Sequence, residues 1–584
     1  MVRPDLQDSG MTTATGGKAR SSVRTDGLVA ILDYAVSSHA RAATVLALIA
    51  LLSFLPGFFQ IPPVDRDEAR FAQATKQMLE TGEFVDIRFQ SDVRYKKPVG
   101  IYWLQAGAVK AGEILGLPNA RTTIWLYRMP SLAGALGAVL LTYWTALAFV
   151  SRRAALLVGL MMATSILLGV EARLAKTDAM LLLTMVAAMG AMARAYLGDR
   201  RPVPSAHPGW MVPAIFWSAL AGGILLKGPL IVMIVALTVA ALAVADRSLR
   251  WLAALRPVAG IVWLALLVLP WFIAILGRSG GSFVAQSLSQ DLLSKLISAQ
   301  EAHGAPPGYY FAVFWLTFWP ASALAAIAAP SAWAVRREKG ARFLLAWIVP
   351  SWIVFELVVT KLPHYVLPLY PAIAILIAGV VDPHLLARKR WLLYGLAWWF
   401  VAPVILAIVT IAILVVLGRQ LGLLAWLFAA ASMIFGLWAW RLYQSDGAER
   451  SLLRAMAASI LLGFAVYGVV IPSLTVAFPS AVLARMLRES DCRHPQVAAA
   501  GYHEPSLVFT IGTQTRLVDG SDAADFLKQG SCRFAVIESR YERSFLRRAE
   551  AIGLRYAPPL RIEGYNYSIG RAGPLSVYRS EETP

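Results

Sequence analysis

Long apolar runs recur along most of the chain and are separated by short polar segments. The runs are about 20 residues long, the length that an α-helix needs to cross a lipid bilayer. Such a helix satisfies its own backbone hydrogen bonds, so it can be apolar all round. We therefore predict about thirteen membrane-spanning helices, near residues 41–60, 126–149, 154–172, 178–197, 211–226, 229–245, 257–277, 309–329, 343–360, 364–381, 392–417, 421–440 and 452–474.

The segments between these runs alternate in character. One set is short and rich in Lys and Arg, at residues 151–153, 199–201, 246–250, 336–339, 388–390 and 441–454. Basic loops of this kind stay on the cytoplasmic side of a membrane. The other set therefore falls outside, including residues 61–125, 173–177, 278–308 and 361–363. An odd number of helices also places the C-terminal residues outside.

The two ends of the chain differ from the part between them. We interpret residues 1–40, which begin with a polar stretch, as a disordered cytoplasmic tail. Residues 41–477 form the transmembrane domain. From residue 478 to residue 584 the apolar segments shorten to strand length, as at 506–510 and 534–537. A helix-like stretch at 521–529, with Ser521 as its N-cap, lies between them, and this alternation predicts a small soluble α/β domain.

Both cysteines of the chain, Cys492 and Cys532, lie in this C-terminal domain. In an oxidising compartment such a pair supports a disulfide. The alternative is two unpaired buried thiols, because spacing alone does not show that two residues are close in space.

Composition agrees with a membrane protein. Of the 584 residues, 58% are hydrophobic and 15% are charged, whereas soluble domains have about 25% charged residues. The net charge of +19 could indicate nucleic-acid binding, but the basic loops that set topology explain it better. We find no basic, aromatic-rich soluble domain that would bind a nucleic acid. The predicted fold class is mainly α and polytopic, with the small C-terminal α/β domain.

The first outer segment concentrates charge directly after the first apolar run. It begins with Asp65, Asp67, Glu68 and Arg70. Charges beside lipid are costly unless they have a function. Residues 67–80 repeat apolar and polar positions with a helical period, which predicts an amphipathic helix along the membrane surface. One aspartate could simply cap that helix, but a cap explains one carboxylate and not the group.

A basic pair, Lys96 and Lys97, precedes Pro98 in the same outer segment. Proline favours the first turn of a helix. The N-terminus of a helix together with two ammonium groups suits an anion such as phosphate. The alternative is a pair of lysines that extend from the lipid interface into water.

Other charged and polar residues stand at the outer ends of later helices and in the segment 278–308. Arg173 and Asp178 could pair only with each other. Several cations and carboxylates on one face nevertheless predict a site for a polyanionic substrate. The residues concerned are Arg173, Asp178, Lys295, His364 and Tyr365.

From about residue 43 to residue 475 the order and spacing of these motifs resemble glycosyltransferase family 39. The matching segments are Asp67-Glu-Ala-Arg70, Lys96-Lys-Pro98 with Tyr102-Trp-Leu104, Arg173-x4-Asp178, Lys227-Gly-Pro229, His303-Gly-x-Pro-x2-Tyr-Tyr310, and Lys361-Leu-Pro-His-Tyr365 with Pro368 and Pro371. Each motif alone is weak, whereas the ordered set is specific. The branch that the chain resembles most is that of the aminoarabinose transferases that modify lipid A.

The resemblance implies a GT-C fold in a multi-pass protein of the bacterial inner membrane, with an active site that faces the periplasm. It implies a sugar donor linked to undecaprenyl phosphate and an inverting transfer to lipid A or a related envelope glycan. Asp67 and Asp178 would be the carboxylates beside the reacting centre, with Arg70 in support. The residues that would hold the donor phosphate are Lys97, Lys96, Tyr365 and Lys295, where the family usually has arginine. Further candidates are Glu68, Arg173, His303 and His364.

The same resemblance raises the question of a metal. Related lipid A transferases can hold zinc with a Glu just before the Lys-Pro motif and a His in the long outer loop. Lys96 and Leu292 stand at those positions here, and neither is among the residue types that bind zinc. Glu301 and His303 could rebuild a site, but we predict no cofactor and turnover that needs no zinc.

Two other functions fit parts of the pattern. One is the transfer of another sugar, such as galacturonic acid or a hexose, to a core glycan or to a protein. The other is a transporter or flippase of a lipid-linked sugar. A transporter should show charges at mid-membrane and paired, interrupted helices related by an internal repeat, and the sequence shows neither.

Overall fold

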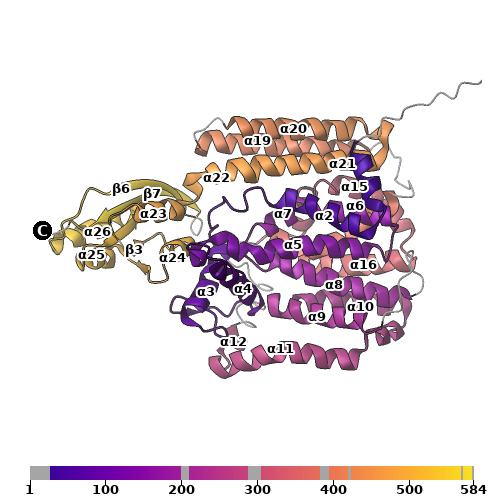
Figure 1. The fold of residues 1–584 in the computed structure, drawn as a ribbon, viewed down its shortest axis with the longest axis horizontal. Coiled ribbons are helices and arrows are strands. Elements are labelled where there is room, and N and C mark those ends of the chain that lie inside the picture. Colours follow the sequence, from indigo (N-terminus) through magenta and orange to yellow (C-terminus); the bar gives the residue numbers. More distant parts are fainter. Residues whose placement is uncertain are drawn as a thin grey trace, which may run out of the picture.

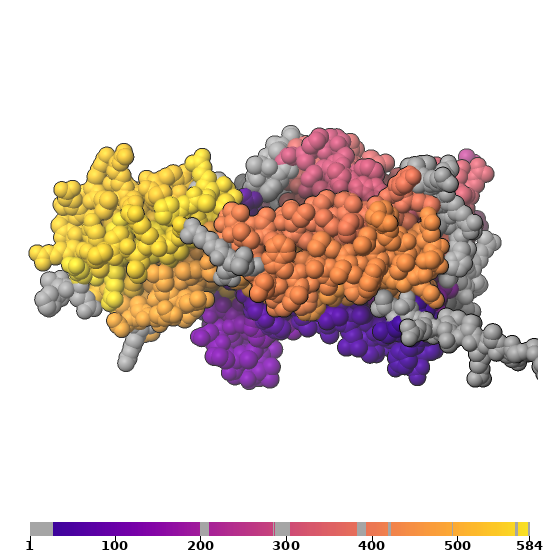
Figure 2. Space-filling view, turned by 90° about the horizontal axis from the view of Figure 1, so that it is seen from above, coloured from indigo at the N-terminus to yellow at the C-terminus, as the bar shows by residue number. Residues whose placement is uncertain are grey.

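The computed structural model describes residues 27–198, 209–286, 304–381, 393–418, 422–492, 494–566 and 570–581. It consists of a bundle of long helices with a smaller α/β domain at one end (Figure 1). In the space-filling view the C-terminal domain, in yellow, projects beyond that end of the bundle (Figure 2).

Within the described residues, eight helical segments are long and apolar enough to cross a membrane, and two bent pairs of helices add two further spans. The eight are α5 (Ile124–Ala146), α8 (Asp178–Leu197), α11 (Pro257–Ser279), α16 (Lys339–Leu357), η5 with α17 (Pro363–Val381), η6 with α19 (Gly395–Gly418), α20 (Leu423–Arg441), and α21 with η7 and α22 (Tyr443–Ser473). The bent pairs are α6 (Arg152–Ala163) with α7 (Ile166–Ala172) and α14 (Tyr309–Thr317) with α15 (Ser322–Ala334). Three shorter apolar helices are α2 (His39–Phe54), α9 (Met211–Lys227) and α10 (Leu230–Asp246). Each predicted span thus coincides with an apolar helix, and the chain is a multi-pass membrane protein.

Two spans are bent where the apolar pattern predicts straight helices. α6 and α7 meet at 60° across Thr164 and Ser165, and α14 and α15 meet at 118°. Backbone groups released by a break need partners inside the membrane. At the first break the Thr164 carbonyl accepts a hydrogen bond from the Ser459 hydroxyl (2.7 Å), and the Ile166 amide donates to the Trp319 carbonyl (3.3 Å). Such partners come from distant segments, so hydropathy does not reveal the bend.

The prediction of a disordered tail through residue 40 is wrong for its second part. Residues 27–36 form the helix α1 (Gly27–Val36), on which Leu32 and Ala35 are buried. Arg153 connects α1 with α21 through ion pairs to Asp33 and Glu449. The small apolar face of α1 packs on the bundle, which explains why this stretch is ordered. Residues 1–26 lie outside the described part of the chain.

The first outer segment contains α3 (Asp67–Thr81), the hairpin of β1 (Arg88–Phe89) and β2 (Asp92–Val93), α4 (Gly100–Ile114) and η1 (Ala120–Thr122). α3 confirms the predicted helix, with Phe71, Ala74 and Met78 buried on one face. Its N-cap position is Arg66, which makes no side-chain cap. The alternative that Asp65 or Asp67 simply caps the helix is therefore ruled out. The later connections contain η3 (Arg250–Leu255) and α12 (Ser282–Ala285).

The C-terminal domain follows η8 (Thr475–Ala477) and is built on a five-stranded sheet of order β4-β3-β5-β7-β6. Its elements are α23 (Pro479–Arg488), β3 (Gln496–Ala500), α24 (Pro505–Ile511), β4 (Arg516–Val518), α25 (Gly520–Lys528), β5 (Arg533–Glu538), α26 (Ser539–Ala551), β6 (Leu560–Asn566) and β7 (Arg571–Arg579). β3 runs parallel to β4 and β5, and β7 runs antiparallel to β5 and β6. Alternate residues of β3 face two helical layers, since Val497 packs with α23 and α24 and Ala498 packs with α25 and α26.

Of the strands and the helix predicted for this domain, one strand and the helix are confirmed and the other strand is wrong. β5 confirms the strand at 534–537, and α25 confirms the helix at 521–529, although its N-cap is Asp519 and not Ser521. Residues 506–510 are not a strand but lie in the helix α24. Pro505 occupies its first turn. The following three residues are all fully buried, so the segment lacks the alternation of a half-buried strand.

Cys492 and Cys532 form a disulfide, with Cα atoms 5.6 Å apart. This is the first of the two alternatives that the sequence leaves open. The bond links the chain just after α23 to the segment that leads into β5, so it joins the helical layer to the sheet.

Candidate functional site

Charged side chains from several outer segments meet at the end of the bundle that carries the C-terminal domain. At their centre is Asp178, the first residue of α8. Its carboxylate pairs with Lys227 at the end of α9, and it lies 3.7 Å from Lys176 Nζ and 3.6 Å from His364 Nε2. We call these four residues and Glu171 the charged cluster.

Glu171, near the end of α7, supplies the second carboxylate of the charged cluster. It lies 2.9 Å from Lys176 Nζ and 3.8 Å from His364 Nδ1. Burial alone lowers the pKa of Lys176, but Glu171 and Asp178 together raise it above its ordinary value. Buried charges are stable only when they are paired, and here two carboxylates face two ammonium groups.

Asp67 and Lys97 lie near the outer edge of the charged cluster. Asp67 is exposed in the first turn of α3 and is close enough to Lys176 to raise its pKa further. Lys97 is half-buried and lies within electrostatic range of His364, whereas Lys96 is exposed. Asp67 follows Arg66, whose φ of 69° is unusual for a residue other than glycine. Strained backbone of this kind gathers at functional sites.

Three members of the charged cluster were not among the predicted site residues: Glu171, Lys176 and Lys227. Lys227 Nζ lies 5.3 Å from the ring centroid of Tyr365, a cation–π contact that brings the predicted phosphate ligand Tyr365 to the cluster. A signal for Lys227 is present in the sequence, because it is a lone charge between two apolar helices, in the Lys-Gly-Pro motif. Glu171 and Lys176 carry a weaker signal, since they flank Arg173 and Asp178.

Glu68 is next to Asp67 in the sequence but has a different environment. It forms a two-pronged ion pair with Arg128 of α5, with both N–O distances 2.8 Å, and the two side chains are 1% and 0% exposed. The same carboxylate accepts hydrogen bonds from the amides of Val64 and Ala175, each at 2.8 Å. Arg128 also donates to three backbone carbonyls, those of Phe58, Ile61 and Pro62. In the structure Glu68 is thus a buried link between α3, α5 and the 173–177 turn, and a role for it in the site stays a prediction.

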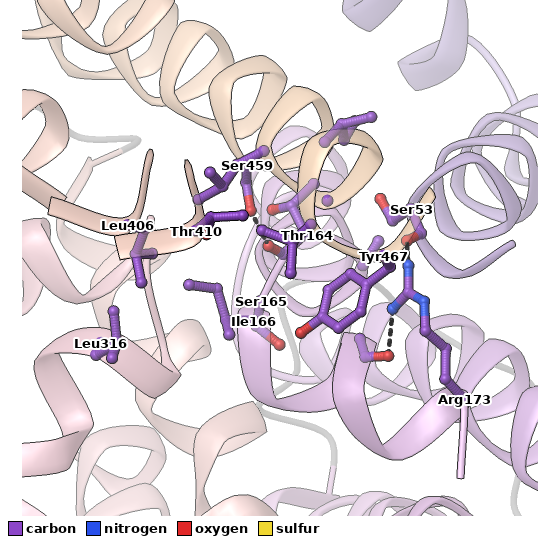
Figure 3. Close-up of a pocket in the computed structure, with 16 residues that line it drawn as sticks. Ser53, Thr164, Ser165, Ile166, Arg173, Leu316, Leu406, Thr410, Ser459 and Tyr467 are labelled. Atoms are coloured by element: carbon purple, nitrogen blue, oxygen red, sulfur yellow. Dashed lines mark hydrogen bonds between the residues drawn. The ribbon is translucent and has the colours of Figure 1, made fainter. Parts of the chain in front are cut away.

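Arg173 does not pair with Asp178. Its guanidinium donates to the backbone carbonyl of Pro56 (2.8 Å) and to those of Ser53 and Gly169, and it lies 4.1 Å from the centroid of the Tyr467 ring. Figure 3 shows Arg173 beside Tyr467. Both residues line a cavity of about 150 Å³. The cavity lies between α2, the α6–α7 break and the π-helical turn η7 (Phe464–Val470). Arg173 thus joins α2 to α7 inside the bundle.

Two predicted site residues, Lys295 and His303, lie in the segment 287–303, outside the described residues. Their roles stay predictions. Arg70 is half-buried in α3, one turn after Asp67.

Asp65 is buried where the first outer segment meets the C-terminal domain. Its carboxylate accepts a hydrogen bond from the Ser506 amide at 2.9 Å. Burial, followed by the neighbouring Glu504, raises the pKa of Asp65 to about 7, whereas Ser506 and Arg70 act in the opposite direction.

We expect folding stability to fall as the pH rises through the pKa of Asp65. The folded protein keeps a proton on Asp65 up to about pH 7, whereas the unfolded chain loses it near pH 4. Between about pH 6 and about pH 8 the free energy of unfolding should fall by about 1.4 kcal/mol, the equivalent of one pKa unit. Melting temperatures across this range should drop more in the wild type than in Asp65→Asn, which keeps an acceptor for Ser506. Equal drops in the two proteins would contradict the assignment to Asp65.

Comparison with known proteins finds likenesses to part of this chain. Residues 44–279 match the family model described as PMT, dolichyl-phosphate-mannose-protein mannosyltransferase. Among curated proteins, an undecaprenyl phosphate-alpha-4-amino-4-deoxy-L-arabinose arabinosyl transferase of Pectobacterium carotovorum is 29% identical over 367 residues, 60% of this chain and 62% of the relative. The namesake from Erwinia tasmaniensis is 29% identical over 322 residues, 53% of this chain and 54% of the relative. The chain thus matches little more than half the length of these curated relatives.

Solved structures extend the likeness of the fold to nearly the whole chain. The crystal structure of ArnT from Cupriavidus metallidurans in the apo state has a TM-score of 0.70 at 18% identity, covering 92% of this chain and 97% of that one. The same protein bound to undecaprenyl phosphate has a TM-score of 0.69 at 19% identity, covering 92% and 98%. The predicted GT-C fold is thereby confirmed. The part of the chain that matches the PMT family model, residues 44–279, holds α3 and all of the charged cluster except His364.

Proposed function

We propose that this protein is a membrane glycosyltransferase that moves a sugar from an undecaprenyl-phosphate-linked donor to lipid A or a related envelope glycan. The observation that carries the proposal is the charged cluster at one end of a transmembrane bundle, with Asp67 and Lys97 near its outer edge. The curated relatives named as undecaprenyl phosphate-aminoarabinose arabinosyl transferases support this donor. The crystal structure of ArnT with bound undecaprenyl phosphate supports it as well.

The proposed reaction needs opposite charges at two places. An acceptor oxygen forms a bond to C1 of the sugar while the bond from C1 to the phosphate oxygen breaks, and the phosphate leaves with the electron pair. Attack from the face opposite to the leaving group inverts the configuration at C1. Positive charge develops on the sugar and negative charge on the phosphate, so fixed carboxylates and cations stabilise the transition state.

The described residues offer groups for both tasks. Asp67 is the exposed carboxylate, which suits it to the sugar side of the breaking bond. Lys96 and Lys97 lie just before α4, where the backbone amides of the first turn also attract an anion. Asp178 pairs with Lys227 and Lys176, and its role is to orient these cations as well as to add negative charge.

We place this site on the periplasmic face of the bacterial inner membrane. The α6–α7 span begins at Arg152 in a short basic loop and ends next to Glu171 of the charged cluster. Since basic loops stay in the cytoplasm, the other end of the span lies outside. The disulfide of the C-terminal domain fits the same side, because disulfides persist in oxidising compartments.

The direct test uses purified protein in detergent with lipid A and a polyprenyl-phosphate-linked aminoarabinose. We expect lipid A whose mass increases by one sugar residue. Parallel donors that carry galacturonic acid or a hexose decide which sugar the protein accepts. Movement of the lipid-linked sugar across a vesicle membrane, with no transfer to any acceptor, would overturn the proposal in favour of a flippase.

Lys97→Ala should impair use of the donor more than Lys97→Arg does. The physical reason is that a charge beside the helix terminus binds phosphate, and arginine keeps that charge. Initial rates with the lipid donor varied would show a larger rise in KM for the alanine variant. If both variants behave alike, Lys97 serves membrane topology and not the donor.

We also propose that turnover needs no zinc. Zinc is held by Cys, His, Asp and Glu, and the part of the chain that the structure describes contains no group of three or more of these side chains arranged so that it could hold a metal ion. The family resemblance implies that Lys96 stands where related lipid A transferases have a zinc-binding Glu, and its ammonium group would repel a dication while protonated. Activity with and without a strong chelator, together with elemental analysis of the purified protein, checks this. Stoichiometric zinc, with activity that the chelator removes and zinc restores, would show the proposal to be wrong.

A further inference from the structure

The C-terminal domain contacts the first outer segment through the short helix α24, which packs on α3 (Figure 1). The amphipathic pattern predicts that the polar face of α3 lies open along the membrane surface. Instead Gln73 and Lys76, both on that face, are only 0% and 4% exposed. The C-terminal domain covers them through α24, although Phe509 of α24 follows Lys76 by 433 residues in the sequence.

Polar contacts join α24 and the turn after it to α3 and to the hairpin that follows. Lys76 Nζ donates to the Phe509 carbonyl at 3.0 Å. Gln73 Nε2 donates to Thr513 Oγ1 at 2.8 Å, and Thr513 Oγ1 donates to Glu80 at 2.6 Å. The side-chain amide of Gln90 donates hydrogen bonds to the backbone carbonyls of Thr513 and Thr515. These bonds fix α24 in one orientation on α3.

The Phe509 side chain is the apolar part of this contact. It is fully buried and belongs to a cluster made largely of transmembrane-domain residues. Its ring meets that of Tyr127 of α5 edge-on, with centroids 5.1 Å apart. The same cluster contains Ala72 of α3 and Ala175, which directly precedes Lys176 of the charged cluster.

Hydrogen bonds continue from this cluster to the site. The Ala175 carbonyl accepts from Gln105 Nε2 at 3.1 Å, and Gln105 Oε1 accepts from the Thr75 hydroxyl of α3 at 2.7 Å. The Ala175 amide donates to Glu68 in the first turn of α3. Two segments that carry site groups, α3 with Asp67 and the turn with Lys176, therefore pack around one aromatic ring from the C-terminal domain.

We propose that Phe509 is a positioning residue, through which the C-terminal domain holds α3 and the 173–177 turn so that Asp67 keeps its place against the charged cluster. The proposal rests on the function proposed above, in which Asp67 acts beside the reacting centre. A displacement of about 1 Å at such a group can cost about a hundredfold in rate. The C-terminal domain is then a working part of the active site and not an appended module.

The test compares Phe509→Ala with Phe545→Ala in the full-length protein. Phe545 is equally buried but packs between α26 and the sheet, so its loss weakens the same domain without touching α3. We expect faster hydrogen exchange at 67–81 and 173–177 in Phe509→Ala only. In the transfer assay we expect kcat to fall about 10- to 100-fold in Phe509→Ala, with the donor KM within about twofold of the wild type. Phe509→Leu, which refills most of the space, should restore most of kcat.

A second variant covers the case in which Phe509→Ala does not fold. Lys76→Met removes the hydrogen bond to the Phe509 carbonyl and keeps the bulk of the side chain, and it should show the same exchange pattern to a smaller extent. Unchanged exchange at 67–81 in both variants would overturn the proposal, and so would an equal loss of kcat in Phe545→Ala. If the wild type transfers no sugar, the proposed function fails, whereas the exchange measurements still decide whether Phe509 anchors α3.

Discussion

Asp67→Asn should give a folded protein that transfers sugar about a hundredfold more slowly than the wild type, a loss of about 3 kcal/mol of transition-state stabilisation. Asn has nearly the shape of Asp, and the side chain is exposed in the first turn of α3. Packing should therefore change little. In the proposed reaction the substitution removes the negative charge on the sugar side of the breaking bond, where it matters most in the transition state.

The check is kcat for the purified variant, measured beside its melting temperature. Asp92→Asn is a matched control, because Asp92 is also exposed in the first outer segment but lies in the β1–β2 hairpin. The control should keep wild-type turnover. Near-normal turnover in Asp67→Asn, with an unchanged melting temperature, would remove Asp67 from the reaction.

Glu68→Ala, in contrast to Asp67→Asn, should mainly destabilise the fold. We expect the free energy of unfolding to fall by about 3–5 kcal/mol, the usual effect of removing one partner from a buried ion pair. Arg128 would keep its charge in a fully buried position, and the amides of Val64 and Ala175 would lose their acceptor. Adjacent carboxylates are thus expected to separate function from folding, since Asp67 affects the rate and Glu68 the fold.

Thermal melting and urea unfolding in detergent measure this loss. Glu68→Gln should be milder than Glu68→Ala, because the amide oxygen can still accept one hydrogen bond from Arg128. The double variant Glu68→Met with Arg128→Met removes the unpaired charge and should recover part of the loss. A melting temperature of Glu68→Ala equal to that of the wild type would show that the pair adds no stability.

The transmembrane part of the fold could be predicted because its signal is local. Each span is a run of apolar residues, and short basic loops mark one side of the membrane. The bends between α6 and α7 and between α14 and α15 escaped prediction, since their exposed backbone groups bind partners from other helices. α24 was mistaken for a strand because a short apolar run is ambiguous unless its neighbours are known.

The candidate site shows the same limit. The motifs of the first outer segment pointed to Asp67 and Lys97, because each of these residues has a neighbour of the same charge in the sequence. The motifs could not reveal that Glu68 is bound by Arg128, which follows it by 60 residues. Nor could they reveal that Lys227 pairs with Asp178, which precedes it by 49 residues. Which of two neighbouring carboxylates is open and which is buried depends on such distant partners.

The anchoring of α3 by α24 also sets the order in which the protein can mature. Lys76 precedes Phe509 by 433 residues, so at about 5–20 residues per second the ribosome adds the anchor about 20–90 s after α3. During this interval Gln73, Lys76 and Glu80 can form hydrogen bonds with water, because the face of α3 that α24 later covers is polar. The aromatic ring that completes the contact arrives last, within a domain that also closes its disulfide. Under the function and the anchoring role proposed above, we therefore expect a newly inserted bundle to stay inactive until α24 has docked on α3.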